Sequence, residues 1–153
     1  MFRYYFLSGA IAFPLCLVIA QPAIADPVDQ LLETRSCPEC ELSNVNLVEA
    51  KLNGANLSLA KMRAANLQKA NLIGANLIGA YLKDANFQEA NLRWANFTNA
   101  DLENVDFRGA DLRGAKFNAA LLKDIINSQK TIFCRTIMSD GKLNNRDCRL
   151  SGD

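Results

Sequence analysis

Residues 65–100 read ANLQKANLIGANLIGAYLKDANFQEANLRWANFTNA, and a large apolar residue stands at every fifth position of this run. The same spacing extends over residues 40–124, where leucine, methionine or phenylalanine occurs seventeen times in succession. A small apolar residue, nearly always alanine, precedes each large one by two positions, and the exceptions are Cys40, Val45 and Val105. This spacing predicts a fold, but it indicates no catalytic activity.

A period of five fits neither a helix nor a continuous strand. Five residues rotate an α-helix by roughly 500°, so the large residues would spread around its whole surface. In a strand, successive large residues would point to opposite faces. The chain must therefore bend once in every repeat, and four corners close a square. With turns stacked at about 4.8 Å, the pattern predicts an all-β solenoid of just over four turns.

The individual repeats resemble those of a known family. Residues 55–59 (ANLSL), 65–69 (ANLQK) and 110–114 (ADLRG) are similar to the A(D/N)LXX unit of pentapeptide-repeat proteins. The resemblance covers residues 40–124. It implies a right-handed quadrilateral β-helix, with the central leucine or phenylalanine and the preceding alanine inside.

Stacking of the turns brings residues twenty positions apart above one another. We expect Phe87 to lie over Phe107, and Phe97 over Phe117 on the opposite face. The residue before each large one is usually asparagine. We interpret these side chains as structural, bonding backbone groups at corners or forming ladders between turns. The alternative is a row of amides that binds a ligand.

The first 25 residues differ from the rest in composition. Arg3 is followed by a mostly apolar segment, residues 6–20, and then by Ala23-Ile24-Ala25 before Asp26. This order predicts a secretory signal peptide over residues 1–25 and export to the periplasm, the thylakoid lumen or the extracellular space. One alternative is an uncleaved membrane anchor, for which residues 6–20 are short. Another is lipid attachment at Cys16, but Phe13-Pro14-Leu15 is a poor context for it.

Charge and motif content argue against several functions. Without Arg3, the predicted mature chain has 16 Lys+Arg and 16 Asp+Glu, which removes the basic surplus that nucleic-acid binding needs. The chain has no histidine, and neither GxGxxG nor a P-loop occurs. We therefore predict no catalytic residues, no cofactor and no metal. The acidic residues from Asp101 to Asp111 are expected to form ion pairs across turns, with a calcium site as the alternative.

Four cysteines remain in the predicted mature chain, an even number that fits an oxidising compartment. Four stacked turns would separate the first two from the last two by roughly 19 Å, whereas a disulfide needs Cα atoms about 4.4–6.8 Å apart. We therefore predict the pairs Cys37–Cys40 and Cys134–Cys148. One alternative is a redox-active CxxC at residues 37–40, which would need to begin a helix. The other is a four-cysteine zinc site, which would need both ends of the rod to meet.

Both flanks are expected to cap the rod, because a solenoid leaves unpaired strand edges at its ends. In the predicted N-terminal cap, residues 26–39, a short helix begins with Asp26 as its N-cap and Pro27 at its first position. The C-terminal cap is predicted over residues 125–153, with an irregular or hairpin segment held by the second disulfide. Residues 119–127 are expected to cover the last turn, and a helix is one form they could take. These cysteine-bearing flanks resemble exported pentapeptide-repeat proteins of cyanobacteria and the thylakoid lumen.

Trp94 is the most informative outward-facing residue. It falls at a corner between Gly74 and Gly114 of the neighbouring turns, and it has two interpretations. The indole covers the gap above a glycine, or it forms part of a protein-contact patch, since tryptophan and arginine are enriched in binding hot spots. The candidate patch consists of Trp94, Ile73, Arg93, Arg113, Ile78 and Tyr81, with Leu59 nearby.

We therefore predict a non-enzymatic structural or protein-interaction module in an exported compartment. Its partner would be another protein, with no nucleic acid and, after signal cleavage, no membrane. The alternative that the resemblance implies is a DNA mimic that inhibits a topoisomerase. Mimicry needs a strongly acidic rod in the cytoplasm, whereas residues 41–124 contain 9 acidic and 10 basic residues.

Overall fold

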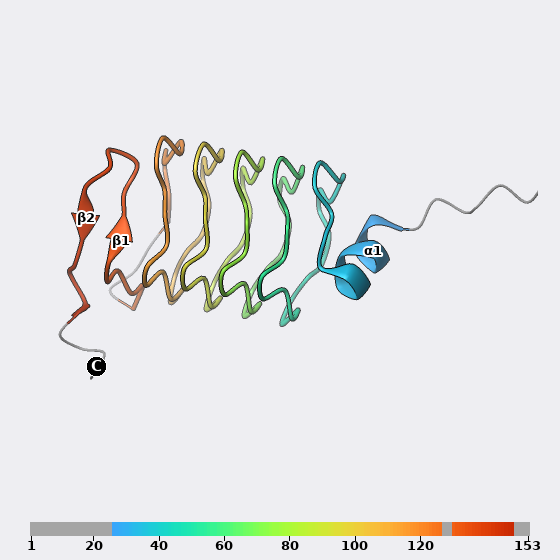
Figure 1. Ribbon diagram of the computed structural model, residues 1–153, viewed down its shortest axis with the longest axis horizontal. Coiled ribbons are helices and arrows are strands. Elements are labelled where there is room, and N and C mark those ends of the chain that lie inside the picture. Colours follow the sequence, from blue (N-terminus) through green and yellow to red (C-terminus); the bar gives the residue numbers. More distant parts are fainter. Residues whose placement is uncertain (1–25, 127–129, 149–153) are drawn as a thin grey trace, which may run out of the picture.

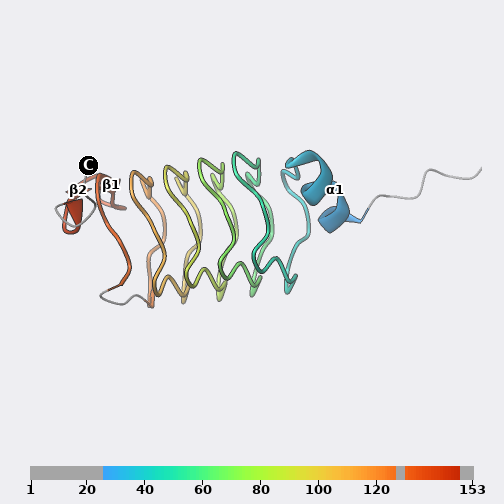
Figure 2. The same cartoon turned by 90° about the horizontal axis from the view of Figure 1, so that it is seen from below.

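The computed structural model describes residues 26–126 and 130–148. Helix α1 (Pro27–Thr34) comes first, and the short strands β1 (Thr136–Ile137) and β2 (Leu143–Asn144) come last. Between them the chain winds in stacked turns, with α1 at one end of the rod and the β1–β2 hairpin at the other (Figures 1 and 2). The predicted signal peptide lies outside the described residues. Within the described ranges, no helix is long and apolar enough to cross a membrane.

Each five-residue unit forms one corner of the square coil and is hydrogen-bonded to the equivalent unit of the next coil. In a typical corner, the backbone N–H of Ala95 donates to the carbonyl of Leu92 at 3.1 Å, and Trp94 between them has a φ of 58°. The N–H of Leu92 donates at 2.8 Å to the carbonyl of Asp111 in the next coil. Parallel bridges join residues twenty apart, such as Asn71 with Asn91. The predicted right-handed quadrilateral β-helix is confirmed.

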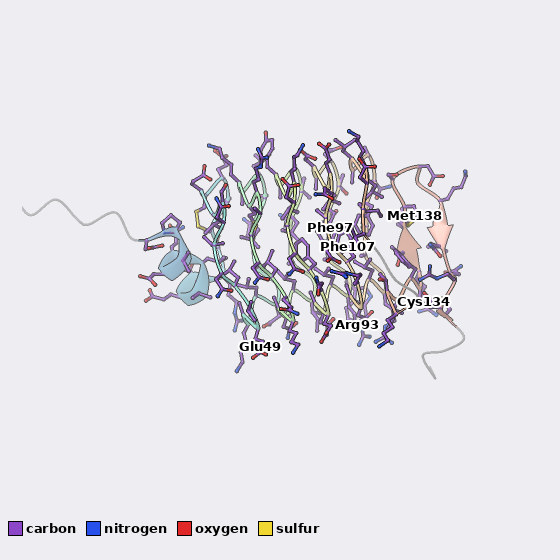
Figure 3. All side chains as sticks on the ribbon, turned by 180° about the vertical axis from the view of Figure 1, so that it is seen from behind. Glu49, Arg93, Phe97, Phe107, Cys134 and Met138 are labelled. Atoms are coloured by element: carbon purple, nitrogen blue, oxygen red, sulfur yellow. A yellow bond between two sulfur atoms is a disulfide. The ribbon has the colours of Figure 1, made fainter. Side chains whose placement is uncertain are left out.

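The core consists of the large residue of each unit and the alanine two positions before it. Phe87 and Phe107 stack with ring centroids 5.5 Å apart, and Phe97 and Phe117 stack at 4.9 Å. All four rings are almost completely buried, and in Figure 3 Phe97 and Phe107 lie within the coil. Stacked aromatic pairs contribute about 0.5–1.5 kcal/mol beyond the area that they bury. The predicted columns of aromatic side chains are therefore confirmed.

The N-terminal end of the rod is closed by α1. Its N-cap is Asp26, whose carboxylate accepts a 2.8 Å hydrogen bond from the N–H of Val28, and Leu31 on the inner face is fully buried. Cys37 is also fully buried, and its N–H donates to the carbonyl of Asn56 in the next coil. It forms a disulfide with Cys40, with Cα atoms 5.4 Å apart. The predicted helix, its cap and this disulfide are confirmed.

The C-terminal end differs from the expectation for residues 119–127. The described part of this segment is not helical, because Leu121 and Ile126 continue the coil by pairing with Asp101 and Asp106. Parallel pairing then extends to Ile137, beyond the predicted end of the repeats. The coil continues because its carbonyls and N–H groups still have partners one turn earlier.

One extra residue enters this last turn. Up to Ile126 the paired residues are twenty apart, whereas Asp111 pairs with Ile132 and Lys116 with Ile137, both twenty-one apart. After the extra residue, Thr131 and Thr136 take the position that alanine occupies elsewhere. Both are fully buried, and their hydroxyls donate to the carbonyls of Phe107 and Leu112 at 2.8 and 2.7 Å.

A hairpin covers part of this final turn. Strand β1 belongs to the last coil and pairs antiparallel with β2, so that Thr136 lies opposite Asn144. Cys134 and Cys148 form the second predicted disulfide, with Cα atoms 4.7 Å apart. The C-terminal cap is therefore a hairpin joined to the coil by a covalent bond.

Candidate protein-contact face

Two of the four long faces of the rod differ in charge, and the parallel bridges define them. We call one the basic face, which comprises residues 50–54, 70–74, 90–94, 110–114 and 131–135. We call the opposite one the paired face, which comprises residues 40–44, 60–64, 80–84, 100–104 and 120–124. Both are built from five stacked units of the same coil.

Trp94 is the largest exposed side chain of the basic face, with 58% of its surface accessible. The indole leans toward the C-terminal end, because a Cβ on Gly114 would lie only 2.4 Å from its Cδ1 atom. On the other side, a Cβ on Gly74 would meet nothing within 4 Å. Trp94 therefore covers Gly114 alone. It keeps more than half of its surface free for a further contact.

Three arginines surround this tryptophan. The guanidinium of Arg93 lies over the indole, 4.5 Å from the ring centroid, in a cation–π contact. Its Nε atom is buried and has no hydrogen-bond partner among the described residues. Arg113 bonds both carboxylate oxygens of Asp111, through Nε at 2.9 Å and Nη2 at 2.6 Å. Arg135 is exposed and sits in the next turn, beside Cys134.

A small pocket of about 50 Å³ lies among these side chains, lined by Arg93, Trp94, Arg113, Gly114, Cys134 and Arg135. Figure 3 shows Arg93 and Cys134 along the same side of the coil. Pockets that enclose a small-molecule ligand measure about 300–1,000 Å³. This pocket has room for one small group of a larger partner, but not for a metabolite or cofactor.

The charges of the basic face do not balance. It has four basic residues, Lys51, Arg93, Arg113 and Arg135, and one acidic residue, Asp111, so its net charge is 4 − 1 = +3. Within the described ranges, Arg93 and Arg135 have no carboxylate within 4.0 Å. The face therefore presents uncompensated positive charge beside an exposed aromatic ring.

The paired face shows the opposite arrangement. Each of its four basic residues contacts a carboxylate within 4.0 Å: Lys61 with Glu41, Arg63 with Asp84, and both Lys83 and Lys123 with Glu103. The hydrogen bond from Lys83, followed by that from Lys123, holds the pKa of Glu103 below its ordinary value. Positive charge on this face is thus neutralised by neighbours.

The structure separates the six residues of the predicted patch. Ile73, Arg93, Trp94 and Arg113 share the basic face, and Ile73 is half-buried one turn before Arg93. Ile78 lies on the next face and Tyr81 on the paired face, 37% and 53% exposed. Leu59 covers Gly79, because a Cβ there would be 2.7 Å from Leu59 Cδ2. The basic face therefore gathers four of the six residues.

Arg135 was not among the predicted residues, although it lines the pocket. The extra residue between Ile126 and Ile132 shifts the register, so a count in steps of five misses it. A signal was nevertheless present in residues 131–138, which read TIFCRTIM. A small residue, threonine, again stands two positions before a large apolar one.

The asparagines have the structural contacts that we expected. The side-chain Oδ1 of Asn91 accepts from the N–H of Arg93 at 3.4 Å, and Asn96 does the same for Thr98 at 3.1 Å. Between turns, Asn76 donates to Asn56 at 3.3 Å. These contacts support the structural interpretation of the asparagines.

The acidic residues near Asp106 pair differently from the prediction. Arg108 bonds Asp106, and Arg113 bonds Asp111, both within a single unit, whereas Glu103 pairs across turns. Residues two apart flank the same unit centre, so an arginine reaches the carboxylate of its own unit. In the described part of the chain, no group of three or more His, Cys, Asp or Glu residues could hold a metal ion.

A wider hollow of about 480 Å³ lies on another face, lined by Gln88, Glu89, Arg108, Gly109 and Lys130. Its most prominent cation, Arg108, is already engaged by Asp106 at 2.6 Å. Burial raises the pKa of Asp106, but the hydrogen bonds and charge of Arg108 and the hydrogen bond from Gln88 together hold this pKa below its ordinary value. The hollow therefore offers less unbalanced charge than the basic face.

Solved structures of pentapeptide repeat proteins from a plant and a cyanobacterium are similar to this chain. A pentapeptide repeat protein from the Arabidopsis thaliana thylakoid lumen is 26% identical, with a TM-score of 0.57, covering 76% of this chain and 73% of that one. Another, Rfr23 from the cyanobacterium Cyanothece 51142, is 26% identical, with a TM-score of 0.33, covering 69% and 96%. No sequence among the curated proteins matches this chain.

The family model of pentapeptide repeats matches eight copies, over residues 40–77, 65–104, 75–114 and 85–124. Together these ranges span residues 40–124, which is more than half of the 153 residues. The matched region coincides with the coils that carry both the basic face and the paired face. The chain belongs to the pentapeptide-repeat family.

Proposed function

We propose that this protein is a non-catalytic docking module that binds another protein through its basic face. The observation that carries the proposal is the exposed Trp94 beside Arg93, next to a pocket too small for a metabolite. Tryptophan and arginine at the centre of a contact contribute more to binding than other residue types. The rod would supply a rigid surface that need not reorganise when the partner binds.

We propose that docking takes place in an exported compartment, the periplasm or the thylakoid lumen. Two disulfides support this, because such bonds persist in oxidising compartments. The similarity to a protein of the thylakoid lumen agrees with it. The composition of residues 1–25, which reads as a signal peptide, is the third support.

The experiment is cross-linking of the tagged full-length protein in its native compartment, with three forms compared. Trp94→Ala removes the exposed ring of the basic face. Tyr81→Ala is the matched control, since Tyr81 is an aromatic residue of the paired face with similar exposure, 53% against 58%. We expect the wild type and Tyr81→Ala to capture the same protein and Trp94→Ala to lose it.

Circular dichroism and thermal melting of the three purified forms establish that the coil is intact. Unchanged capture by Trp94→Ala would contradict docking through the basic face. Loss of the partner in Tyr81→Ala alone would indicate that the partner binds the paired face instead. The topoisomerase alternative is not favoured, because DNA mimicry needs an acidic surface and this face carries a surplus of three positive charges.

A further inference from the structure

Two arginines of the basic face lie in neighbouring turns, where their like charges repel each other. Arg93 and Arg113 occupy the same position in successive turns, since the N–H of Trp94 donates to the carbonyl of Arg113. Like charges on directly neighbouring strands destabilise a sheet. Asp111 neutralises Arg113, and the Trp94 ring contacts Arg93, but no acidic residue of this face is left for Arg93 or Arg135.

Nothing in the fold requires this arrangement. On the paired face Lys83, Glu103 and Lys123 alternate in sign in successive turns, with separations of 2.7 and 3.1 Å. Arg63, one turn before Lys83 in the same column, is itself paired with Asp84 at 3.5 Å. A glutamate in place of Arg113 would produce the same alternation on the basic face. A local arrangement that opposes stability without serving the fold is typical of a functional surface.

We propose that the basic face recognises an acidic segment of the partner protein, with one carboxylate seated in the pocket between Arg93 and Arg135 and the Trp94 ring packed beside it. This inference rests on the proposed function and names the chemistry of the partner. The pocket of about 50 Å³ is of the order of one or two waters, whose share of liquid volume is about 30 Å³ each. A carboxylate matches that size, and the planar fork of arginine bonds carboxylates in two-point geometry.

A protein fits this surface better than a membrane or a nucleic acid. Stable attachment to anionic lipids uses clusters of about 4–8 basic residues and an apolar face that inserts. Of the four basic residues here, Arg113 is already paired with Asp111. Trp94 is the one large exposed apolar side chain among the described residues of this face, so no apolar face is available to insert. Nucleic-acid binding likewise uses a longer array of cations.

Trp94 is the single tryptophan of the chain, so its fluorescence reports on this site directly. We suggest titrating the full-length protein with a Glu-Ser repeat peptide free of aromatic residues, and with its Gln-Ser counterpart. The binding variant is Arg93→Gln/Arg135→Gln. The matched control is Arg63→Gln/Lys123→Gln on the paired face, which removes the same net charge and leaves the pocket unchanged.

We expect the Glu-Ser peptide alone to change the Trp94 emission. Binding should weaken about tenfold in Arg93→Gln/Arg135→Gln, because two ion pairs at the surface are lost, and change little in the control. Raising NaCl from about 0.05 to about 0.5 M should also weaken it, since screening shortens the reach of exposed charges.

Equal weakening by both double variants would overturn the inference, because net charge and not the pocket would then control binding. An emission change with phosphatidylglycerol vesicles but not with the Glu-Ser peptide would also overturn it, in favour of a lipid surface. Capture of the partner by cross-linking could depend on Trp94 and yet be unaffected by salt and by Arg93→Gln/Arg135→Gln. The docking function would then stand, and the inference that the partner segment is acidic would be wrong. If the peptide binds but Trp94→Ala captures the same proteins, the docking function is wrong instead.

Discussion

The paired face and the basic face cover the same core, in the same coil and with the same hydrogen-bond register. Leu102 lies behind one and Leu112 behind the other, and both are buried. The two faces differ in the outward residues. Every basic residue of the paired face contacts a carboxylate, whereas the charged residues of the basic face are mostly basic. In this rod the buried residues therefore determine the fold, whereas the outward residues can vary from face to face without changing it.

Stacking explains why the difference is meaningful. Each outward residue has neighbours twenty positions before and after it, so a column of like charges repels along its whole length. On the paired face carboxylates offset that repulsion, since Arg63 pairs with Asp84 and Lys83 pairs with Glu103. On the basic face Arg113 pairs with Asp111, whereas Arg93 has no carboxylate within 4.0 Å among the described residues. This is the difference that we propose serves binding.

The largest expected effect tests whether the two faces share an equivalent core. Leu102→Ala and Leu112→Ala each remove one buried leucine, 0% and 1% exposed. Each should lower the free energy of unfolding by about 2–5 kcal/mol, from lost burial and the cavity left behind. Urea denaturation followed by circular dichroism measures both.

The two values should agree within about 2 kcal/mol, which is the spread found for the same substitution at different buried sites. A much smaller loss for Leu112→Ala would mean that the basic face rests on a looser core. Its outward residues would then differ from those of the paired face for structural reasons.

A smaller effect tests whether the Trp94 ring packs against Gly114. Gly54 and Gly114 both have positive φ values, 68° and 70°, but a Cβ meets nothing at Gly54 and meets the indole at Gly114. Gly54→Ala should cost about 1 kcal/mol, from the left-handed backbone alone. Gly114→Ala should cost about 1–2 kcal/mol more, because the ring must move.

Chemical denaturation gives these costs, and the emission maximum of Trp94 gives the position of the ring. The emission should change in Gly114→Ala and stay constant in Gly54→Ala. An unchanged emission in Gly114→Ala would show that the indole does not rest on that glycine.

The five-residue period was sufficient to predict the coil, because each unit repeats the same corner and the same buried pair. It also predicted the disulfides, since the length of the rod kept the two pairs of cysteines apart. The end of the coil was harder to place. Threonine replaces alanine at positions 131 and 136, and one extra residue interrupts the count after Ile126.

The candidate site was predictable only in part. Counting in fives placed Ile73, Arg93 and Arg113 in one column with Trp94 beside it. It could not give the direction in which the indole leans, because Gly74 and Gly114 are equivalent in the sequence pattern. Among the described residues no carboxylate lies within 4.0 Å of Arg93, and this depends on side-chain geometry across turns, which the five-residue period does not contain.

Acid should affect the paired face through Glu103. Hydrogen bonds from Lys83 and Lys123 hold its pKa below the ordinary value of 4.5 in the folded protein. A lowered folded-state pKa means that this stabilisation is complete above about pH 5 and is lost as the pH falls through the folded value. The melting temperature of the wild type should therefore fall more steeply below about pH 5 than that of Glu103→Gln. Parallel pH profiles for the two proteins would show that the lysines do not stabilise the charged glutamate.

The smallest expected effect contrasts one cation from each face. Lys83→Gln should lower the melting temperature, because Glu103 loses its 2.7 Å partner. Arg93→Gln should leave the free energy of unfolding within about 0.5 kcal/mol of the wild type or raise it, since relief of repulsion from Arg113 offsets the lost contact with Trp94. Thermal melts at low and high NaCl measure both, and both differences should shrink as salt screens the charges. If Arg93→Gln were as destabilising as Lys83→Gln, Arg93 would serve the fold, and the distinction between the two faces would be lost.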